Sequence, residues 1–284
     1  RIYEQTNEKF YYDVAENFWD MVVNHRQYCN GGTGEKERFK GRDEIAKHLE
    51  GYEAETCATY NMLKLTRNLF FHAPDAKYMD YYERGLYNGI LPSLLTVRAG
   101  NNVTYFTPLA PGSRKEFGNG YTCCAGTGME NHTKYQDSIY FRTRDNSALY
   151  VNLYIPSVLN WEEKGFKMRL ETNWPSQQSS KFIIEKGGRL DINFRVPYWA
   201  ESGFTIEING KVQEMDALSG SYVTVGRRWK EGDEIVVSYP YSLRLERTPD
   251  DSTVGALFYG PILLVGKDRR SDFIELKLNT EDLS

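Results

Sequence analysis

Residues 148–155 read ALYVNLYI, and their apolar side chains alternate with the period of two that is typical of a β-strand. Stretches at 181–185, 190–196, 204–208, 221–225 and 233–237 alternate in the same way or are rich in β-branched residues. Gly-rich turns separate them, and the pair Asn209-Gly210 predicts a hairpin turn of the primed type. Many short strands with regular turns predict an antiparallel β-sandwich over residues 145–284.

Upstream of this stretch the period is helical. Apolar residues recur at helical spacing over 8–28 and 60–71, and Pro74-Asp75 opens a third helix that Pro92 stops. We predict a last helix from about Gly128 to Tyr140, and a short strand or loop over 104–109. The sequence therefore predicts a multidomain α and β protein, with a helical segment over residues 1–144 followed by the β-sandwich domain.

Composition excludes two classes of partner. The 35 basic residues are scattered and are outnumbered by 39 acidic ones, which disfavours nucleic acid. The longest apolar run, residues 256–266, is broken by Gly260-Pro261 and is far below the roughly 20 residues that span a bilayer, so no membrane association is expected. The first residue is not Met and no signal-peptide pattern follows, so we expect a processed or truncated chain of unknown compartment.

Three of the four cysteines lie in two compact motifs, Glu55-Thr56-Cys57 and Cys123-Cys124. Three thiols and one carboxylate are a complete tetrahedral ligand set for zinc. Residues two apart inside a helix point about 200° apart, so Glu55 and Cys57 can share an ion only in extended backbone or at a helix entry. The positive end of the helix dipole at such an entry would also favour thiolates and carboxylates.

Other interpretations of these cysteines stay open at this point. They could be small buried apolar residues, a strained disulfide between Cys123 and Cys124, or ligands of a purely structural zinc. A carboxylate ligand is more typical of a zinc site that performs chemistry. The histidines show no metal-ligand spacing, and surface or core roles are expected for His25, His48, His72 and His132.

Several motifs together resemble the β-L-arabinofuranosidases of glycoside hydrolase families 127 and 146, with family 146 the closer of the two. The resemblance covers nearly the whole chain. Its motifs are GGTGEKERF at 31–39, ETCATYNMLKLT at 55–66, YERGLYN at 82–88, CCAGTGMEN at 123–131 and YGP at 259–261.

The resemblance implies a retaining hydrolase that releases terminal β-L-arabinofuranose from plant-type glycans. It implies that zinc is the cofactor, held by Glu55, Cys57, Cys123 and Cys124. Cys123 would also be the nucleophile, because a zinc-bound thiolate can attack the anomeric carbon at neutral pH.

The resemblance further implies that Glu37 is the acid/base, which protonates the leaving oxygen and later activates water. Glu35, two residues away, is the competing assignment. Glu83 and Tyr105 match family positions that line the sugar pocket. Without the resemblance, Glu83 reads as an exposed partner of Arg84 or Lys77, and Tyr105 as a core residue.

The resemblance implies an (α/α)6 barrel followed by β-sandwich modules, and only four or five helices are visible here. We therefore expect the C-terminal part of the barrel, with an apolar helical face that a missing N-terminal barrel segment or a second chain covers. A secreted or periplasmic location is somewhat favoured. Two rival functions remain: a non-catalytic carbohydrate-binding protein with a structural zinc site, and a thiol redox module.

Overall fold

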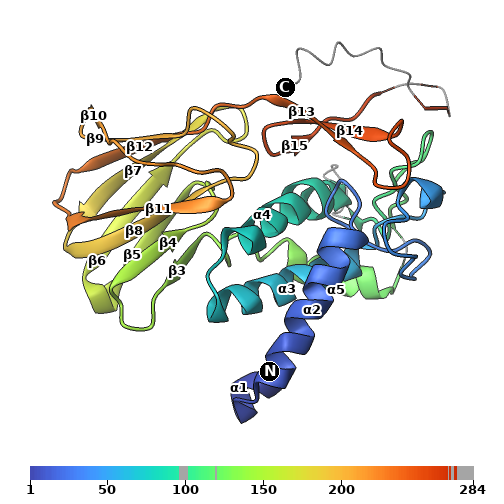
Figure 1. The fold of residues 1–284 in the computed structure, drawn as a ribbon, viewed down its shortest axis with the longest axis horizontal. Helices are drawn as coiled ribbons and strands as arrows, with labels where there is room; N and C mark the ends of the chain where they lie inside the picture. Colours follow the sequence, from blue (N-terminus) through green and yellow to red (C-terminus); the bar gives the residue numbers. More distant parts are fainter. Residues whose placement is uncertain (96–101, 119, 268, 270–271, 274–284) are drawn as a thin grey trace. The chain divides into compact units, whose positions relative to one another are not determined.

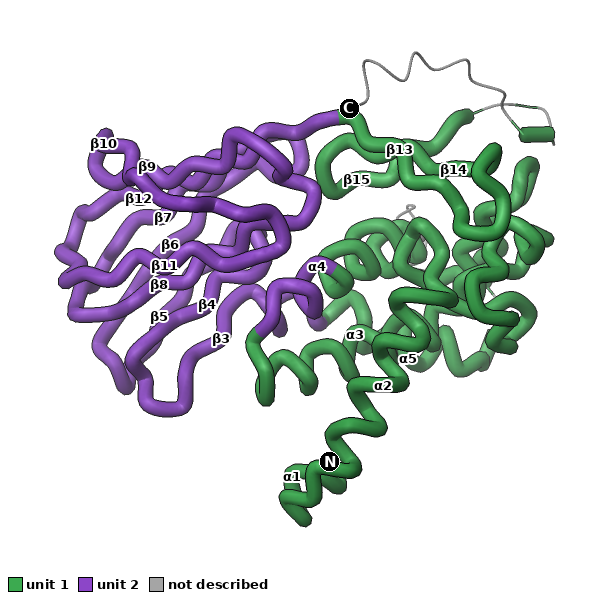
Figure 2. Tube along the Cα trace, in the orientation of Figure 1, with its two compact units in different colours: residues 1–74, 81–133, 243–284 green, residues 75–80, 134–242 purple. Residues whose placement is uncertain are grey.

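The computed structural model describes residues 1–95, 102–118, 120–267, 269 and 272–273. By its contacts the chain forms two compact units (Figure 2): unit 1 comprises residues 1–74, 81–133 and 243–284, and unit 2 comprises residues 75–80 and 134–242. The division into domains at residue 144 stays a prediction, because the compact units have different limits. None of the described helices is long and apolar enough to cross a membrane.

The described residues of the first half of the chain contain five α-helices (Figure 1). They are α1 Ile2–Thr6, α2 Lys9–His25, α3 Thr56–His72, α4 Ala76–Gly85 and α5 Cys123–Asn131. The helices predicted over 8–28 and 60–71 are present, and α3 begins at Thr56, earlier than its apolar pattern indicated. Helices α2 and α3 pack through a buried hydrogen bond, in which the Trp19 indole donates to the Thr66 hydroxyl at 2.7 Å.

The prediction for the last helix was wrong. Helix α5 begins at Cys123 and ends at Asn131, and residues 140–142 form strand β3 instead. The Thr122 side chain accepts a hydrogen bond from the Ala125 N–H and caps the helix, which places its start ahead of the two cysteines. The stretch 104–109 is mainly a loop; short strands β1 Leu94–Leu95 and β2 Asn102–Val103 pair just before it.

Unit 2 contains a six-stranded sheet in the order β10-β9-β12-β7-β6-β5 and a four-stranded sheet in the order β11-β8-β4-β3. Apolar residues of both sheets, such as Phe182 and Phe194, meet in one core, as in a sandwich. The strands are β3 Tyr140–Arg142, β4 Ala148–Val151, β5 Ser157–Trp161, β6 Phe166–Glu171, β7 Ser179–Lys186, β8 Arg189–Val196, β9 Thr205–Ile208, β10 Lys211–Val212, β11 Ser221–Arg228 and β12 Glu234–Ser238.

The expectation of a wholly antiparallel arrangement was wrong at one pair, because β4 and β8 run parallel. The long connection from β4 to β8 passes through β5, β6 and β7 of the other sheet, which leaves room for a parallel return. The predicted hairpin at Asn209-Gly210 is present between β9 and β10, and both residues have positive φ, as the primed turn requires.

A third sheet belongs to unit 1 and comprises β13 Leu243–Arg247, β14 Gly255–Tyr259 and β15 Ile262–Leu263. Its last strand is tied to the π-helical turn Leu86–Ile90: the Asn88 amide donates to the Pro261 carbonyl at 3.0 Å and accepts from the Leu263 N–H at 2.9 Å. The family-like motifs at 82–88 and 259–261 therefore meet in space, although about 170 residues of chain separate them.

Candidate active site

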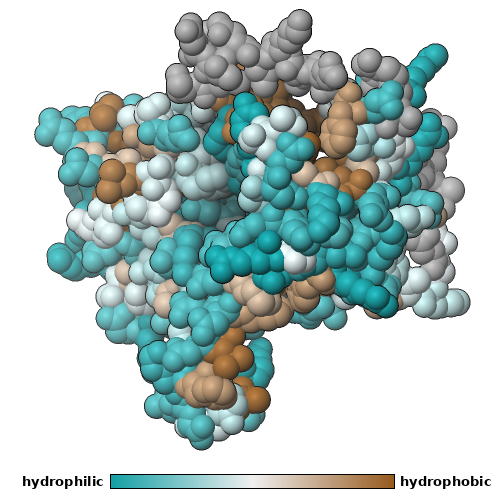
Figure 3. Space-filling view, turned by 45° about the vertical axis from the view of Figure 1, so that its right-hand side comes forward, coloured by the Kyte–Doolittle hydropathy of each residue, from teal (hydrophilic) through white to brown (hydrophobic). Residues whose placement is uncertain are grey.

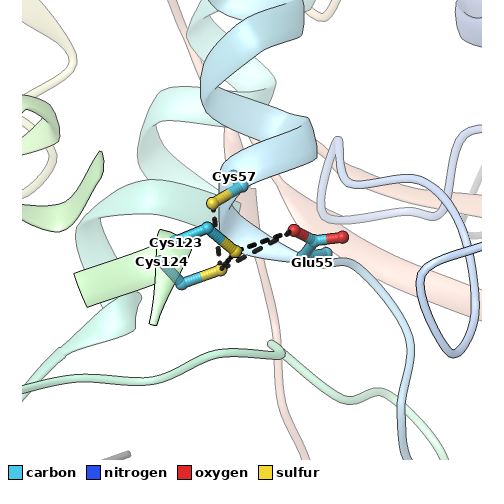
Figure 4. A group of neighbouring side chains, drawn as sticks. All are labelled: Glu55, Cys57, Cys123 and Cys124. Carbon is cyan, nitrogen blue, oxygen red and sulfur yellow. Dashed lines mark hydrogen bonds between the residues drawn. The ribbon is translucent and has the colours of Figure 1, made fainter. Parts of the chain in front are cut away.

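Glu55, Cys57, Cys123 and Cys124 form one cluster, in which the four candidate ligand atoms all lie within 4.8 Å of one another (Figure 4). The Cys123 sulfur is 3.7 Å from Glu55 Oε1 and 3.9 Å from the Cys124 sulfur. The Cys124 sulfur is 3.8 Å from Glu55 Oε1 and 3.2 Å from the Cys57 sulfur. All of these residues come from the starts of helices α3 and α5.

The backbone at the start of α3 explains how Glu55 and Cys57 face the same point. Glu55 is the N-cap residue and has non-helical backbone angles (φ −57°, ψ 129°), whereas Cys57 lies in the first helical turn. The helical 200° separation therefore does not apply to this pair. The Thr56 N–H donates to the Tyr105 carbonyl at 3.0 Å, which ties this helix start to the 104–106 segment.

The spacing of the four atoms fits a tetrahedral metal. Ligands about 2.3 Å from a tetrahedral zinc are separated from one another by about 3.8 Å. The distances from Glu55 to both thiols of the pair, and between those thiols, agree with this value, while Cys57 and Cys124 are somewhat closer together. All four cysteines of the chain are free thiols, so the Cys123–Cys124 disulfide is not formed.

Burial raises the pKa of the Cys57 and Cys124 thiols. Metal binding must therefore displace protons from them, because the thiolate is the ligand. The Thr127 hydroxyl lies 3.3 Å from the Cys57 sulfur and lowers its pKa in part. A set of three thiols and one carboxylate, partly buried and at tetrahedral spacing, could hold zinc.

Tyr105 connects the cluster to a carboxylate. Its hydroxyl donates a hydrogen bond to Glu37 Oε1 and lies 3.3 Å from the Cys123 sulfur. The contacts with Cys123 and then Glu37 raise the pKa of Tyr105, so the phenol keeps its proton at neutral pH. Tyr105 therefore lies between the two residues to which the sequence assigned the chemistry, Cys123 and Glu37.

Glu37 lies on a tight turn with unusual backbone angles. The N–H and C=O groups of Glu35 and Arg38 pair with each other at 3.1 and 3.2 Å, and Lys36 and Glu37 between them have φ of 48° and 62°. Two successive positive φ values define a turn of type I′, which normally holds Asn or Gly. Such positions cost energy and persist only where the surroundings impose them.

Glu35 points away from this chemistry. Its side chain is about 2% exposed and forms ion pairs with Lys36 at 2.9 Å and Lys40 at 2.5 Å. Burial by itself raises the pKa of Glu35, but the hydrogen bonds from Lys40 and Lys36 outweigh this effect and hold the pKa below its usual value. A group that must donate a proton needs the opposite shift, so these ion pairs favour Glu37 over Glu35 as the acid.

Glu83 is the remaining candidate for a contact with the sugar. Glu83 is buried on α4, which differs from the exposed position expected without the resemblance, and Arg84 beside it pairs with Glu246 at 2.6 Å. A role for Glu83 at the sugar stays a prediction. The cluster contains no histidine; His25, His48 and His72 instead lie within 4 Å of acidic side chains, those of Asp43, Glu44 and Glu4.

Sequence reasoning missed two residues beside the site. Thr127 lies four residues after Cys123 on α5, so helical spacing would have found it if the start of the helix had been placed correctly. The second is Glu53, whose buried carboxylate accepts hydrogen bonds from the N–H groups of Gly51 and Leu109. Nothing in the sequence around Glu53 distinguishes it from a solvated loop charge.

The chain matches two sequence profiles of one family. Residues 1–137 match the profile described as the β-L-arabinofuranosidase GH127 catalytic domain, and residues 148–241 match the GH127 middle domain. Among curated proteins, a non-reducing end β-L-arabinofuranosidase of Bifidobacterium longum subsp. longum is 19% identical, over 88% of this chain and 41% of its own length.

Solved structures show the same fold. A GH127 β-L-arabinofuranosidase from Geobacillus stearothermophilus T6 superposes with a TM-score of 0.74 at 24% identity, covering 86% of this chain and 41% of that one. A second structure, described as a GH127 β-arabinofuranosidase, has a TM-score of 0.80 at 23% identity, covering 92% of this chain and 45% of that one. The chain thus spans less than half the length of each of these relatives.

Proposed function

Because the chain belongs to glycoside hydrolase family 127, we propose that it is the catalytic part of a retaining β-L-arabinofuranosidase acting on terminal sugars of plant-type glycans. One observation carries the proposal: the Tyr105 hydroxyl contacts both Glu37 and the Cys123 sulfur of the metal-ligand cluster. A nucleophile and a carboxyl group that face a common point are the two groups that retaining hydrolysis requires.

The separation of these two groups supports the retaining assignment. Because one hydroxyl oxygen contacts both, the Glu37 carboxylate and the Cys123 sulfur are at most about 6 Å apart, the sum of two hydrogen-bond lengths. Retaining glycosidases place their two catalytic groups about 5–5.5 Å apart, whereas inverting enzymes need about 6.5–9.5 Å to admit a water molecule. The arrangement therefore favours direct attack by sulfur.

We assign Glu55, Cys57, Cys123 and Cys124 as the zinc ligands. Zinc, when bound, supplies the positive charge that keeps the thiols deprotonated at neutral pH. Cys57 and Cys124 are buried and serve as anchors. Cys123 is the exposed member of the cluster, so its sulfur is the one that a substrate can reach.

In the first half of the reaction, the Cys123 sulfur attacks the anomeric carbon and forms a C–S bond. The glycosidic C–O bond breaks, and Glu37 gives its proton to the leaving oxygen. In the second half, the ionised Glu37 accepts a proton from water, the water oxygen attacks the same carbon, and the C–S bond breaks. Two displacements at one carbon retain its configuration.

The helical unit supports a further part of the proposal, namely that it is the C-terminal part of an (α/α)6 barrel. Phe10, Val14 and Phe18 recur every fourth residue along α2 and are exposed, in an apolar stripe (Figure 3). We propose that an upstream barrel segment or a second chain covers this stripe. The motif at residues 55–66 further supports a closer relation to family 146 than to other branches of these enzymes.

The test combines a metal assay with a nucleophile variant in the full-length protein. We expect one zinc per chain and release of L-arabinose from an aryl β-L-arabinofuranoside, with Cys123→Ser abolishing turnover. Absence of zinc, or full activity of Cys123→Ser, would show the mechanism to be wrong. Glycan binding without any turnover by the unmodified protein would favour the non-catalytic alternative.

A further inference from the structure

A cavity of about 820 Å³ opens beside the candidate active site, within unit 1. Two loop segments form most of its lining: residues 49–52, and residues 104–116 with gaps. Tyr105 belongs to this lining and also contacts the Cys123 sulfur. The cavity is thus contiguous with the site but is not part of the metal-ligand cluster.

Two loop segments form the walls of the cavity: one is hydrogen-bonded to the turn that carries Glu37, and the other to the start of α3, which carries two of the proposed metal ligands. The Tyr52 carbonyl accepts a hydrogen bond from the Lys36 N–H at 3.1 Å, which joins the first wall to the turn that bears Glu37. The Tyr105 carbonyl accepts from the Thr56 N–H at 3.0 Å, which joins the second wall to the start of α3. A ligand in the cavity is therefore held in a fixed position relative to the Glu37 turn and to the metal-ligand cluster.

Glu53 joins the two walls to each other. One oxygen of its fully buried carboxylate accepts from the Gly51 N–H at 2.5 Å, and the other accepts from the Leu109 N–H at 2.9 Å. Such charge-assisted hydrogen bonds to backbone are stronger than neutral ones. The cavity is consequently pre-formed by a buried side chain and is not a chance gap between mobile loops.

The lining has the chemistry of a sugar site. The Tyr52 and Phe106 rings meet edge to face, with centroids 5.9 Å apart, and Tyr52 remains 49% exposed. An exposed aromatic face accepts the C–H face of a sugar, while polar groups at the rim bond to its hydroxyls. Arg114 is the one basic side chain among the described lining residues, which also include Glu50 and Glu116, so an anionic sugar is disfavoured.

We propose that this cavity is a leaving-group subsite, which binds the neutral oligosaccharide to which the cleaved sugar is attached. The position fits, because the leaving oxygen departs on the side of the acid/base, and the Lys36–Glu50 ion pair at 2.5 Å connects the Glu37 turn to the cavity lining. The inference rests on the proposed function for the identity of the bond that is cleaved. Binding itself is independent of turnover.

The experiment uses the full-length zinc-loaded enzyme and measures binding and kinetics separately. Binding of α-1,5-linked arabinotriose, which lacks the β-linkage to be cleaved, is titrated by NMR, with trigalacturonate as the anionic comparison. We expect Tyr52→Ala to weaken arabinotriose binding about tenfold, which corresponds to about 1.4 kcal/mol. Tyr52→Phe should bind normally. Tyr259→Ala, which removes a ring of similar exposure on β14, is the matched control and should have no effect.

In kinetics, Tyr52→Ala should lower kcat/KM about tenfold for a β-L-arabinofuranosyl oligosaccharide and less than twofold for an aryl β-L-arabinofuranoside. Equal loss on both substrates, unchanged arabinotriose binding, or tighter binding of trigalacturonate would each overturn the subsite. If arabinotriose binds through Tyr52 but neither substrate is hydrolysed, the subsite stands as a glycan site and the proposed function fails.

Discussion

The hydroxyl oxygen of Tyr105 lies 3.3 Å from the sulfur of Cys123. The same hydroxyl donates a hydrogen bond to Glu37, so its oxygen lone pairs face the sulfur and its O–H bond faces the carboxylate. A phenol in this position can hold Glu37 at a constant distance from the nucleophile. Under the proposed mechanism, Tyr105 is therefore the residue that aligns Glu37 with Cys123.

Tyr105→Phe should lower kcat by roughly ten- to a hundredfold and change KM little. The variant keeps the ring in place but removes its hydrogen bond to the Glu37 carboxyl group, an interaction worth about 1–3 kcal/mol. Steady-state kinetics on an aryl β-L-arabinofuranoside measure the effect. Tyr52→Phe removes a hydroxyl from the neighbouring wall and is the control; equal kcat values for the two variants would contradict the alignment role.

Cys57→Ser and Cys124→Ser should each lower the zinc content of the purified protein and its thermal midpoint. Both residues are buried members of the proposed ligand set, and a missing thiolate would leave that set incomplete. Inductively coupled plasma mass spectrometry gives the metal-to-protein ratio. Cys29→Ser changes the one cysteine that lies outside the cluster, and it should retain the metal. Full zinc in Cys57→Ser would contradict the assignment.

Glu35→Gln should misplace Glu37 without touching the substrate. The substitution removes the buried charge that holds Lys36 and Lys40, and with it a restraint on the turn that holds Glu37 at positive φ. We expect kcat/KM to fall about tenfold for a sugar leaving group and much less for a dinitrophenyl leaving group, because a good leaving group needs no proton.

The leaving-group comparison separates this positioning role from general damage to the fold. A loss of stability alone would lower the rates for both leaving groups by the same factor. Glu44→Gln changes a half-exposed carboxylate in the same loop region, paired with Lys47 and His48, and should leave both rates unchanged. Equal losses on the two substrates in Glu35→Gln would refute the positioning role.

Glu246 should make the stability of unit 1 depend on pH. Burial by itself raises the pKa of Glu246. The charges of Arg84 and Arg244 outweigh this effect and hold the pKa below its usual value of 4.5. The depressed pKa means that the stabilisation is complete above about pH 4.5 and is lost as pH falls through the folded-state pKa. We expect Glu246→Gln to cost about 1–3 kcal/mol at pH 7 and much less at pH 3.

Urea unfolding at the two pH values measures this difference. Asp13→Asn is the control, because Asp13 pairs with Lys9 on the surface of α2, where an ion pair contributes little. We expect no measurable change in that variant at either pH. A cost of Glu246→Gln that is the same at pH 7 and pH 3 would contradict the assignment of the charge.

Asp80→Asn should strongly destabilise unit 2. The Arg195 side chain is fully buried and forms an ion pair with Asp80 at 2.5 Å, and the Tyr198 N–H donates to the same carboxylate oxygen at 3.2 Å. Removal of one partner leaves a buried charge without compensation, at a cost of about 3–5 kcal/mol. Differential scanning calorimetry measures it, with the exposed Asp216→Asn as control. Equal thermal unfolding midpoints for Asp80→Asn and Asp216→Asn would contradict the stabilising role of the Asp80–Arg195 ion pair.

The spacing of apolar residues predicted helices and strands correctly in the segments where that spacing was regular. The pattern over 8–28 matches α2, and the stretches 181–185 and 190–196 lie within β7 and β8. It failed at α5, because CCAGTGMEN has two glycines and little apolar periodicity, and a single capping threonine decides where the helix begins. The parallel pairing of β4 with β8 depends on contacts between segments about 40 residues apart.

For the candidate site, too, the sequence indicated some features and the tertiary structure added others. Residue types alone indicated that Glu55, Cys57, Cys123 and Cys124 could form a metal-ligand set, because the affinity of thiols and carboxylates for metal ions is a property of the groups themselves. The family resemblance also reduced the candidates for the acid/base to two glutamates of one loop, Glu35 and Glu37. The tertiary structure favours one of them by the partners that each carboxylate has. The type I′ turn and the lysines beside it direct Glu35 inward, while Glu37 extends to Tyr105.

The sequence by itself thus determined which groups are present and which halves of the chain are helical or β-stranded. The tertiary structure decided which groups meet: Tyr105 is 68 residues from Glu37 and 18 from Cys123, and one hydroxyl contacts both. The physical reason is that ligand chemistry and periodicity are local properties. The direction of a side chain at a turn, and the partner it reaches, depend on packing between distant segments.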